Sequence, residues 1–212
     1  MRRLPVYLLL DTSGSMLGEP IEAVRTGMQS LLSALRQDPY ALESAWLSVI
    51  TFSDRAQQVV PLTDLAQFQA PALTAKSTTS MGGALKLLAE RIDQEVTKSS
   101  PEQKGDWKPI VFMMTDGRAT DELEPGIAAI KAAKIGTLVA CAAGPDADTA
   151  SLQRITDSVV RLDTADSNSI KAFFKWVSAS ISTTSQKVDL AKKDINGLGD
   201  LPPPPPEVNV VI

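Results

Sequence analysis

Short runs of apolar residues recur along the chain and indicate buried β-strands. Turn-forming residues bound each run, and the runs have the length and β-branched content of strands. Most are apolar at consecutive positions, which is typical of strands that have helices on both faces of a parallel sheet. The five runs are Val6–Leu10, Ala45–Phe52, Ile110–Met114, Leu138–Ala142 and Val159–Leu162.

Between these runs, apolar residues recur every three or four positions and predict amphipathic helices. These stripes occupy residues 21–35, 85–96, 127–134 and 170–181, and a short helix is expected over 149–157. Residues 57–62 follow a tight turn, and Pro61 suits an edge strand that pairs antiparallel in a hairpin. The pattern predicts an α/β fold: a doubly wound, mostly parallel sheet with one antiparallel edge strand and helices on both faces. Ligands of such sheets bind at the carboxyl ends of the strands.

The C-terminal part of the chain has a different pattern. We expect one domain in residues 1–185, followed by an extension over 186–212 that contains five consecutive prolines, Pro202–Pro206. A proline run of this kind is stiff and extended. Its composition favours a linker, whereas the alternation of Val208, Val210 and Ile212 suits a strand that adds to a sheet edge.

Composition narrows the chemistry that this chain can perform. Its 212 residues are 43% hydrophobic, enough for one substantial core. Lys and Arg number 21 against 25 Asp and Glu, so the net charge of −4 gives no general attraction to nucleic acid or to an anionic membrane. The chain has no histidine and a single cysteine, Cys141, which removes the usual zinc ligands and any internal disulfide. A bound metal would therefore have to favour oxygen.

The N-terminus has a superficial likeness to a secretion signal. Two arginines precede an apolar run, but that run ends at Asp11 after about ten residues, and a first core strand explains it better. No segment approaches the ~20 apolar residues that span a bilayer. We therefore expect a cytoplasmic protein with no membrane partner, which also suits an unpaired cysteine.

Oxygen-bearing side chains follow the predicted strands at three separate places. Asp11, Ser13 and Ser15 alternate along the loop after the first strand, so their side chains can converge on one point. Asp116 ends the run that begins at Ile110, and Thr79 lies just before a predicted helix. Carboxylates and hydroxyls suit a hard cation such as Mg²⁺, Mn²⁺ or Ca²⁺. These five side chains are the predicted metal ligands.

Three motifs resemble those of von Willebrand factor type A domains. Asp11-Thr-Ser-Gly-Ser15 matches Asp-x-Ser-x-Ser, Thr79-Ser-Met-Gly-Gly-Ala-Leu85 matches Thr-x-x-Gly-x-Ala-Leu, and Thr115-Asp-Gly117 follows in the expected order. The resemblance covers roughly residues 4–183. Any one motif alone is weak evidence, but all three in order and at strand ends make a strong match.

The resemblance implies a metal-ion-dependent adhesion site, which binds partners and catalyses no reaction. It makes Ser13, Ser15 and Thr79 direct ligands of the metal and gives Asp11 and Asp116 water-mediated or state-dependent contacts. Such a site leaves the metal short of anionic donors, so an Asp or Glu of a protein partner can take the open coordination position. The expected cofactor is Mg²⁺, with Mn²⁺ or Ca²⁺ as alternatives.

Within that family the chain is most similar to bacterial TerY-like proteins of tellurite resistance. The overall layout carries this resemblance, together with Arg2-Arg-Leu-Pro-Val-Tyr7 and with Met16 after the second serine. It implies a scaffold or regulator in a stress-response signalling complex, with a co-encoded kinase or phosphatase as the possible partner. TerY-like chains often continue into a cysteine-rich metal-binding segment, for which this chain, with its one cysteine, has no counterpart.

Several other interpretations of these residues exist. Asp11, Ser13 and Ser15 are also residues that favour a plain turn and helix cap, and Thr78 or Ser80 could replace Thr79 as the hydroxyl donor. A haloacid-dehalogenase-like phosphotransferase also ends its first strand on a magnesium-binding aspartate, but its Asp-x-Asp is Asp-Thr-Ser here and lacks the second carboxylate. A flavodoxin-like phosphate loop is disfavoured because an aspartate there would repel the anion. Met16 and Met81 could form either an apolar rim at the site or part of the core.

Overall fold

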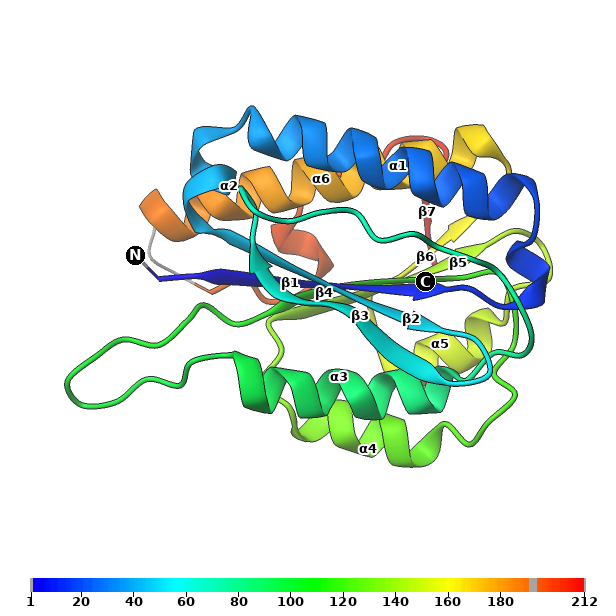
Figure 1. The fold of residues 1–212 in the computed structure, drawn as a ribbon, viewed down its shortest axis with the longest axis horizontal. Coiled ribbons are helices and arrows are strands. Elements are labelled where there is room, and N and C mark those ends of the chain that lie inside the picture. Colours follow the sequence, from blue (N-terminus) through cyan, green and yellow to red (C-terminus); the bar gives the residue numbers. More distant parts are fainter. Residues whose placement is uncertain (1, 191–193, 212) are drawn as a thin grey trace.

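The computed structural model describes residues 2–190 and 194–211. Within these ranges the chain forms one seven-stranded sheet in the order β3-β2-β1-β4-β5-β6-β7 (Figure 1). The five central strands are parallel, and both edge strands, β3 and β7, are antiparallel to their neighbours. The strands are β1 (Leu4–Asp11), β2 (Ala45–Phe52), β3 (Ala56–Asp64), β4 (Ile110–Thr115), β5 (Thr137–Ala143), β6 (Val159–Leu162) and β7 (Asn209–Val210).

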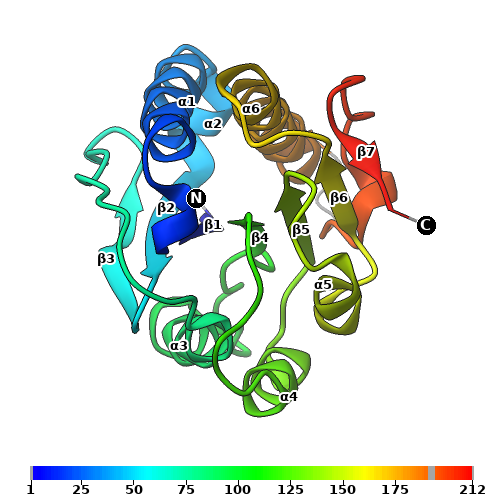
Figure 2. The ribbon, with the colours of Figure 1, turned by 90° about the vertical axis from the view of Figure 1, so that its right-hand side faces the viewer.

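Helices cover both faces of the sheet. Figures 1 and 2 show α1, α2 and α6 on one face and α3, α4 and α5 on the other. This arrangement confirms the predicted doubly wound α/β fold, and β7 adds a second antiparallel edge strand to the one that the sequence predicts. The helices are α1 (Glu19–Arg36), α2 (Pro39–Ser44), α3 (Met81–Glu95), α4 (Glu124–Ala132), α5 (Thr149–Ile155) and α6 (Ser167–Leu190), with short 3₁₀ turns η1 (Gly14–Met16) and η2 (Leu198–Asp200).

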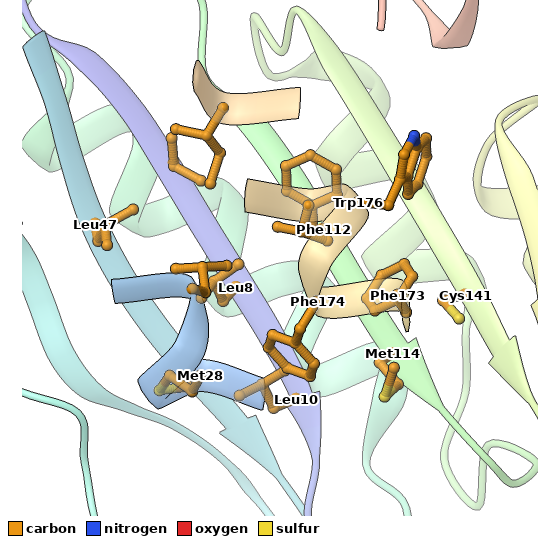
Figure 3. Packing of buried hydrophobic residues seen from close by; sticks show 14 of the residues in the cluster. Leu8, Leu10, Met28, Leu47, Phe112, Met114, Cys141, Phe173, Phe174 and Trp176 are labelled. Atoms are coloured by element: carbon orange, nitrogen blue, oxygen red, sulfur yellow. The ribbon is translucent and has the colours of Figure 1, made fainter. Parts of the chain in front are cut away.

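The sheet separates two apolar cores because successive side chains of each strand point to opposite faces. Along β1, Leu8 and Leu10 pack toward α1 and α6, whereas Tyr7 and Leu9 pack toward α3. Figure 3 shows the first core, in which Phe112 of β4 meets Trp176 of α6 edge to face at 6.3 Å between ring centroids. Burial of each such side chain contributes roughly 1.5–3 kcal/mol. The cores fix β1 and β4 side by side at the centre of the sheet.

Helices α1 and α6 approach each other closely at a glycine. A Cβ atom on Gly27 of α1 would lie 2.6 Å from the ring of Phe174 of α6, closer than real Cβ contacts. Gly27 therefore allows the ring to lie directly against the α1 backbone. The contact holds α1, which begins just after the loop of Asp11, Ser13 and Ser15, in place over the sheet.

The C-terminal segment packs on the domain. Val210 pairs with Val160 of β6, and the side chain of Val208 is buried in the core of the α1/α6 face. The indole Nε1 of Trp176 donates a hydrogen bond of 2.8 Å to the carbonyl of Pro202. The last described residues therefore act as an added strand at the β6 edge, and α6 continues to Leu190, past residue 185.

Candidate functional site

Two central strands bring the predicted site residues together at the carboxyl ends of the parallel strands. β1 and β4 pair in parallel with Leu10 opposite Met114, so Asp11 and Asp116 leave neighbouring strands at the same end. Figure 2 views the molecule from this end, where the loops after β1 and β4 and the start of α3 face the reader. Ligands of open α/β sheets bind at this end, outside the carboxyl ends of the strands.

The carboxylate of Asp11 is buried at the end of β1, with the residue 1% exposed. One oxygen accepts a hydrogen bond of 2.8 Å from the backbone N–H of Ser13, and the other accepts one of 2.5 Å from the hydroxyl of Thr115. Burial raises the pKa of Asp11, and the hydrogen bonds from Ser13 and Thr115 oppose that rise. The two bonds fix the carboxylate in one orientation.

The hydroxyls of the first loop connect Asp11 to Asp116. The Oγ atoms of Ser13 and Ser15 lie 3.0 Å apart, and Ser15 donates a hydrogen bond of 2.7 Å to Oδ1 of Asp116. Burial also raises the pKa of Asp116, and the bond from Ser15 opposes the rise. Three of the five predicted ligands are thus linked oxygen to oxygen, and Asp11 joins them through the backbone N–H of Ser13.

The fifth predicted ligand, Thr79, reaches the same place from the segment before α3. A Cβ atom built on Gly117 would lie 3.7 Å from the hydroxyl oxygens of both Ser15 and Thr79, so these two hydroxyls border one small space. The backbone N–H of Thr79 donates to the hydroxyl of Thr120 at 3.0 Å, which holds this segment against the loop after β4.

The neighbours of Thr79 have other roles. Ser80 donates its hydroxyl to Asp121 at 3.1 Å, and Thr78 is exposed. Of the three adjacent hydroxyl residues, Thr79 is the one whose oxygen lies beside Gly117 and Ser15.

A further aspartate, which the sequence did not single out as functional, organises the site. Asp121 accepts hydrogen bonds from the backbone N–H groups of Gly82 and Gly83 at 2.9 and 2.8 Å, at the first turn of α3. The carboxylate therefore caps the helix from a different loop and ties Thr79 to the loop that bears Asp116. Two adjacent glycines at a helix start leave room for such an approach, but they do not identify the residue that makes it.

Of the two interpretations of Met16 and Met81, the structure supports core residues and contradicts an apolar rim at the site. Met16 and Met81 are both buried, so they fill the core. Leu17, the residue that follows the 3₁₀ turn η1, is 64% exposed instead, whereas Met16, the last residue of that turn, is directed inward. Leu17 is one of the few large apolar side chains that the described residues leave exposed.

The donor set suits a hard divalent cation. Among the described residues, no Lys or Arg nitrogen lies within ion-pair distance of Asp11 or Asp116, so the two carboxylates have no cation partner there. In the same part of the chain no three His, Cys, Asp or Glu side chains are placed to hold a metal ion together, and the donors here are two carboxylates and three hydroxyls. Oxygen donors of this kind fit Mg²⁺, Mn²⁺ or Ca²⁺ better than softer metals.

The fold and the three motifs define a class of protein. The profile of the von Willebrand factor type A domain matches residues 6–176, and the chain belongs to this family. Domains of this class typically mediate metal-dependent protein interactions through a metal-ion-dependent adhesion site, and they are generally not enzymes.

Individual relatives agree with that assignment. An uncharacterized protein of Synechocystis sp. is 35% identical over 123 residues, which are 55% of this chain and 26% of that protein. A von Willebrand factor type A structure from Catenulispora acidiphila matches with a TM-score of 0.65 and 18% identity, over 86% of this chain and 43% of its own. Proximal thread matrix protein 1 from the mussel byssus, with zinc in its adhesion motif, matches with a TM-score of 0.60 and 17% identity, over 84% of this chain and 45% of its own. The chain thus spans about a quarter of the first relative and less than half of these two structures.

The length and hydropathy of the helices show whether any of them could span a membrane. None of the helices in the described part of the chain is both long enough and apolar enough to cross a bilayer.

Proposed function

We propose that this chain binds a protein partner through a divalent cation held by Asp11, Ser13, Ser15, Thr79 and Asp116. The observation that carries the proposal is the convergence of these five oxygen-bearing side chains from three separate segments on one edge of the sheet. Family membership supports it, because metal-dependent protein binding is the typical function of type A domains.

The roles of the five residues follow from their surroundings. Ser13, Ser15 and Thr79 would contact the ion directly through neutral oxygens, and the family resemblance assigns water-mediated or state-dependent contacts to Asp11 and Asp116. A bound divalent ion would supply a positive centre with a coordination position open to a carboxylate. Asp11, fixed by Ser13 and Thr115, orients the first loop and provides negative charge that is already desolvated.

The partner is proposed to offer an Asp or Glu with an apolar residue beside it. The acid would complete the coordination of the metal, and the exposed side chain of Leu17, two residues from Ser15, would contact the apolar neighbour. Burial of apolar surface next to a charged contact adds affinity and excludes water from it.

Mg²⁺ is the proposed cofactor, with Mn²⁺ or Ca²⁺ as alternatives. The mussel protein carries zinc in the corresponding motif. Zinc prefers sulfur and nitrogen ligands, and the proposed ligand set contains neither, so oxygen chemistry favours the harder ions here.

A finer proposal places the protein in a bacterial stress-response complex of the tellurite-resistance type. The resemblance of residues 2–7 and of the overall layout to TerY-like proteins supports it, and a kinase or phosphatase of that system is the proposed partner. The proposed location is cytoplasmic. We expect no catalysis, since Ser13 stands where a haloacid-dehalogenase-like phosphotransferase carries its second aspartate.

A manganese soak followed by anomalous diffraction tests the metal site. The proposal expects one strong anomalous peak among the oxygens of Ser13, Ser15 and Thr79, and its loss in Asp11→Asn. A protein with no peak at this edge of the sheet would contradict the proposal. Capture of the purified kinase or phosphatase of the same genome, compared with and without EDTA, then tests the partner.

A further inference from the structure

A cleft lies at the amino ends of the central strands, at the opposite end of the sheet from the candidate metal site. Its volume is about 770 Å³, and it is bordered by the C-terminal half of α3, the end of α4 and the residues just before β4. In Figure 1 the long loop between α3 and β4 and the N-terminus mark this end of the molecule. A volume of this size is in the range that binds small ligands or short peptide segments.

The walls of the cleft combine apolar and charged residues. Ala89 and Ile92 of α3 and Ala129 and Ala132 of α4 line the cleft, and the short alanine side chains take up little of its space. Trp107 forms another part of the wall, and the guanidinium of Arg2 stacks on its ring at 3.5 Å from the centroid. Because Ile92 and Trp107 are themselves buried, the apolar surface open to a ligand comes from the partly exposed side chains of Ala89, Val96, Ala129 and Ala132.

Within the described residues, three cations around the cleft have no acidic partner: two lysines and Arg2, whose guanidinium donates to the backbone carbonyls of Gly105 and Asp106. Lys98 forms an ion pair of 2.6 Å with Asp93, and both line the cleft. The side chains of Lys108 and Lys134 also line it and are exposed, and within the described residues neither has a carboxylate at ion-pair distance.

Two of the three acids that line the cleft are paired with cations, Asp93 with Lys98 and Asp106 with Arg3. Asp106 binds Arg3 at 2.6 Å, and Asp194 accepts a hydrogen bond of 3.0 Å from the backbone N–H of Lys108. Arg2, Lys108 and Lys134 therefore outnumber the one lining acid that no cation pairs within the described residues, Asp194, so the mouth of the cleft is basic although the net charge of the chain is −4.

We propose that this cleft binds an acidic, partly apolar peptide segment of a protein partner. The apolar part of the walls would take side chains such as leucine, and Lys108 and Lys134 would contact carboxylates on either side of them. Complementary charge at a rim raises the association rate and selects among partners, while the apolar contacts hold the complex. The proposal is independent of the metal site, so one domain would hold two partners at opposite ends and act as a scaffold.

A peptide-binding assay in EDTA tests the proposal, because the chelator prevents peptide carboxylates from binding at a metal. The probe is a short fluorescein-labelled peptide of leucine and glutamate, compared with a leucine–lysine peptide and a glycine–glutamate peptide by fluorescence polarisation. We expect binding of the leucine–glutamate peptide alone. Equal binding of the glycine–glutamate peptide would show that charge alone attracts the peptides, and this would overturn the proposal. Absence of binding by the leucine–glutamate peptide would also overturn it.

Charge reversal then locates the bound peptide. Lys108→Glu and Lys134→Glu should each weaken binding on the order of ten-fold. Lys131→Glu is the matched control, because Lys131 is an exposed lysine of α4 that does not line the cleft, and it should change the affinity little. All three positions are exposed, so circular dichroism should show an unchanged fold. An equal effect of all three reversals would contradict binding in the cleft.

Discussion

The two ends of β1 carry polar clusters that differ in how their charges are balanced. At the start of the strand, Arg3 forms an ion pair of 2.6 Å with Asp106, and Asp106 also accepts the backbone N–H of Thr97 at 2.7 Å. Nearby, the hydroxyl of Tyr7 donates to Glu95 at 2.9 Å. At the other end, Asp11 and the hydroxyls around it meet no cation among the described residues.

The difference separates a structural cluster from a binding site. A buried carboxylate that has an arginine and several N–H donors gains little from a further ligand, whereas a desolvated carboxylate beside neutral hydroxyls still lacks a positive charge. Residue types alone do not distinguish the clusters, since both contain aspartate and hydroxyl groups. We therefore expect substitutions at the start of β1 to change stability and substitutions at its end to change binding.

The largest expected effect is the loss of metal binding in Asp11→Asn. This near-isosteric change removes one of the two carboxylates and should weaken Mg²⁺ or Mn²⁺ binding about 100-fold or more, as loss of a ligand or its supporting shell does. Titration calorimetry measures the change. Without metal, the free energy of unfolding should stay the same or rise, because a desolvated charge is removed. Asp54→Asn, an exposed acid at the same sheet edge, is the matched control and should bind metal as the wild type does.

The next effect is a loss of stability in Arg3→Met. The substitution leaves the carboxylate of Asp106, whose side chain is 6% exposed, without its cation and should lower the free energy of unfolding by about 2–3 kcal/mol. Urea denaturation with and without Mg²⁺ measures it. Metal affinity should not change, and a parallel fall in metal affinity would show that the two ends of β1 are coupled.

Tyr7→Phe should have a smaller, pH-dependent effect. Glu95 keeps its hydrogen bonds from Gln58, so the loss at neutral pH should be about 1 kcal/mol. Burial and the charge of Glu95 raise the pKa of Tyr7 above the ordinary 10.0, so above that pH the unfolded chain loses the proton while the folded protein keeps it. Wild-type stability should therefore fall as the pH rises beyond 10, and Tyr7→Phe should show a shallower decline in denaturation curves. Parallel curves would contradict this assignment.

The smallest expected effect concerns Leu17. Leu17→Ser removes exposed apolar surface beside the site and should weaken partner binding about five-fold, which corresponds to roughly 1 kcal/mol of lost burial. Metal affinity and stability should be unchanged, because the side chain is 64% exposed and no proposed ligand lies at this position. Surface plasmon resonance with the purified partner measures the difference, and Leu42→Ser on the distant helix α2 serves as control.

Much of the fold follows from the sequence because it depends on local periodicity. The apolar runs at residues 6–10, 45–52 and 110–114 lie within β1, β2 and β4, and the stripes between the strands match the long helices. Parallel strands place their carboxyl ends together, so the meeting of Asp11 and Asp116 follows from strand order as well. The three motifs then indicated both the family and the candidate ligands.

Only the tertiary structure decided the contacts that depend on long-range packing. The pairing of β7 with β6, the capping of α3 by Asp121 and the inward direction of Met16 beside the exposed Leu17 join segments or faces that no local pattern specifies. The composition of the proline-rich segment favours a linker and its valine alternation favours a docked strand, and these residues do not determine whether a sheet edge is free to receive them. The balance of charge at the two ends of β1 likewise appears only in space, since Arg3 meets Asp106 across 103 positions of sequence.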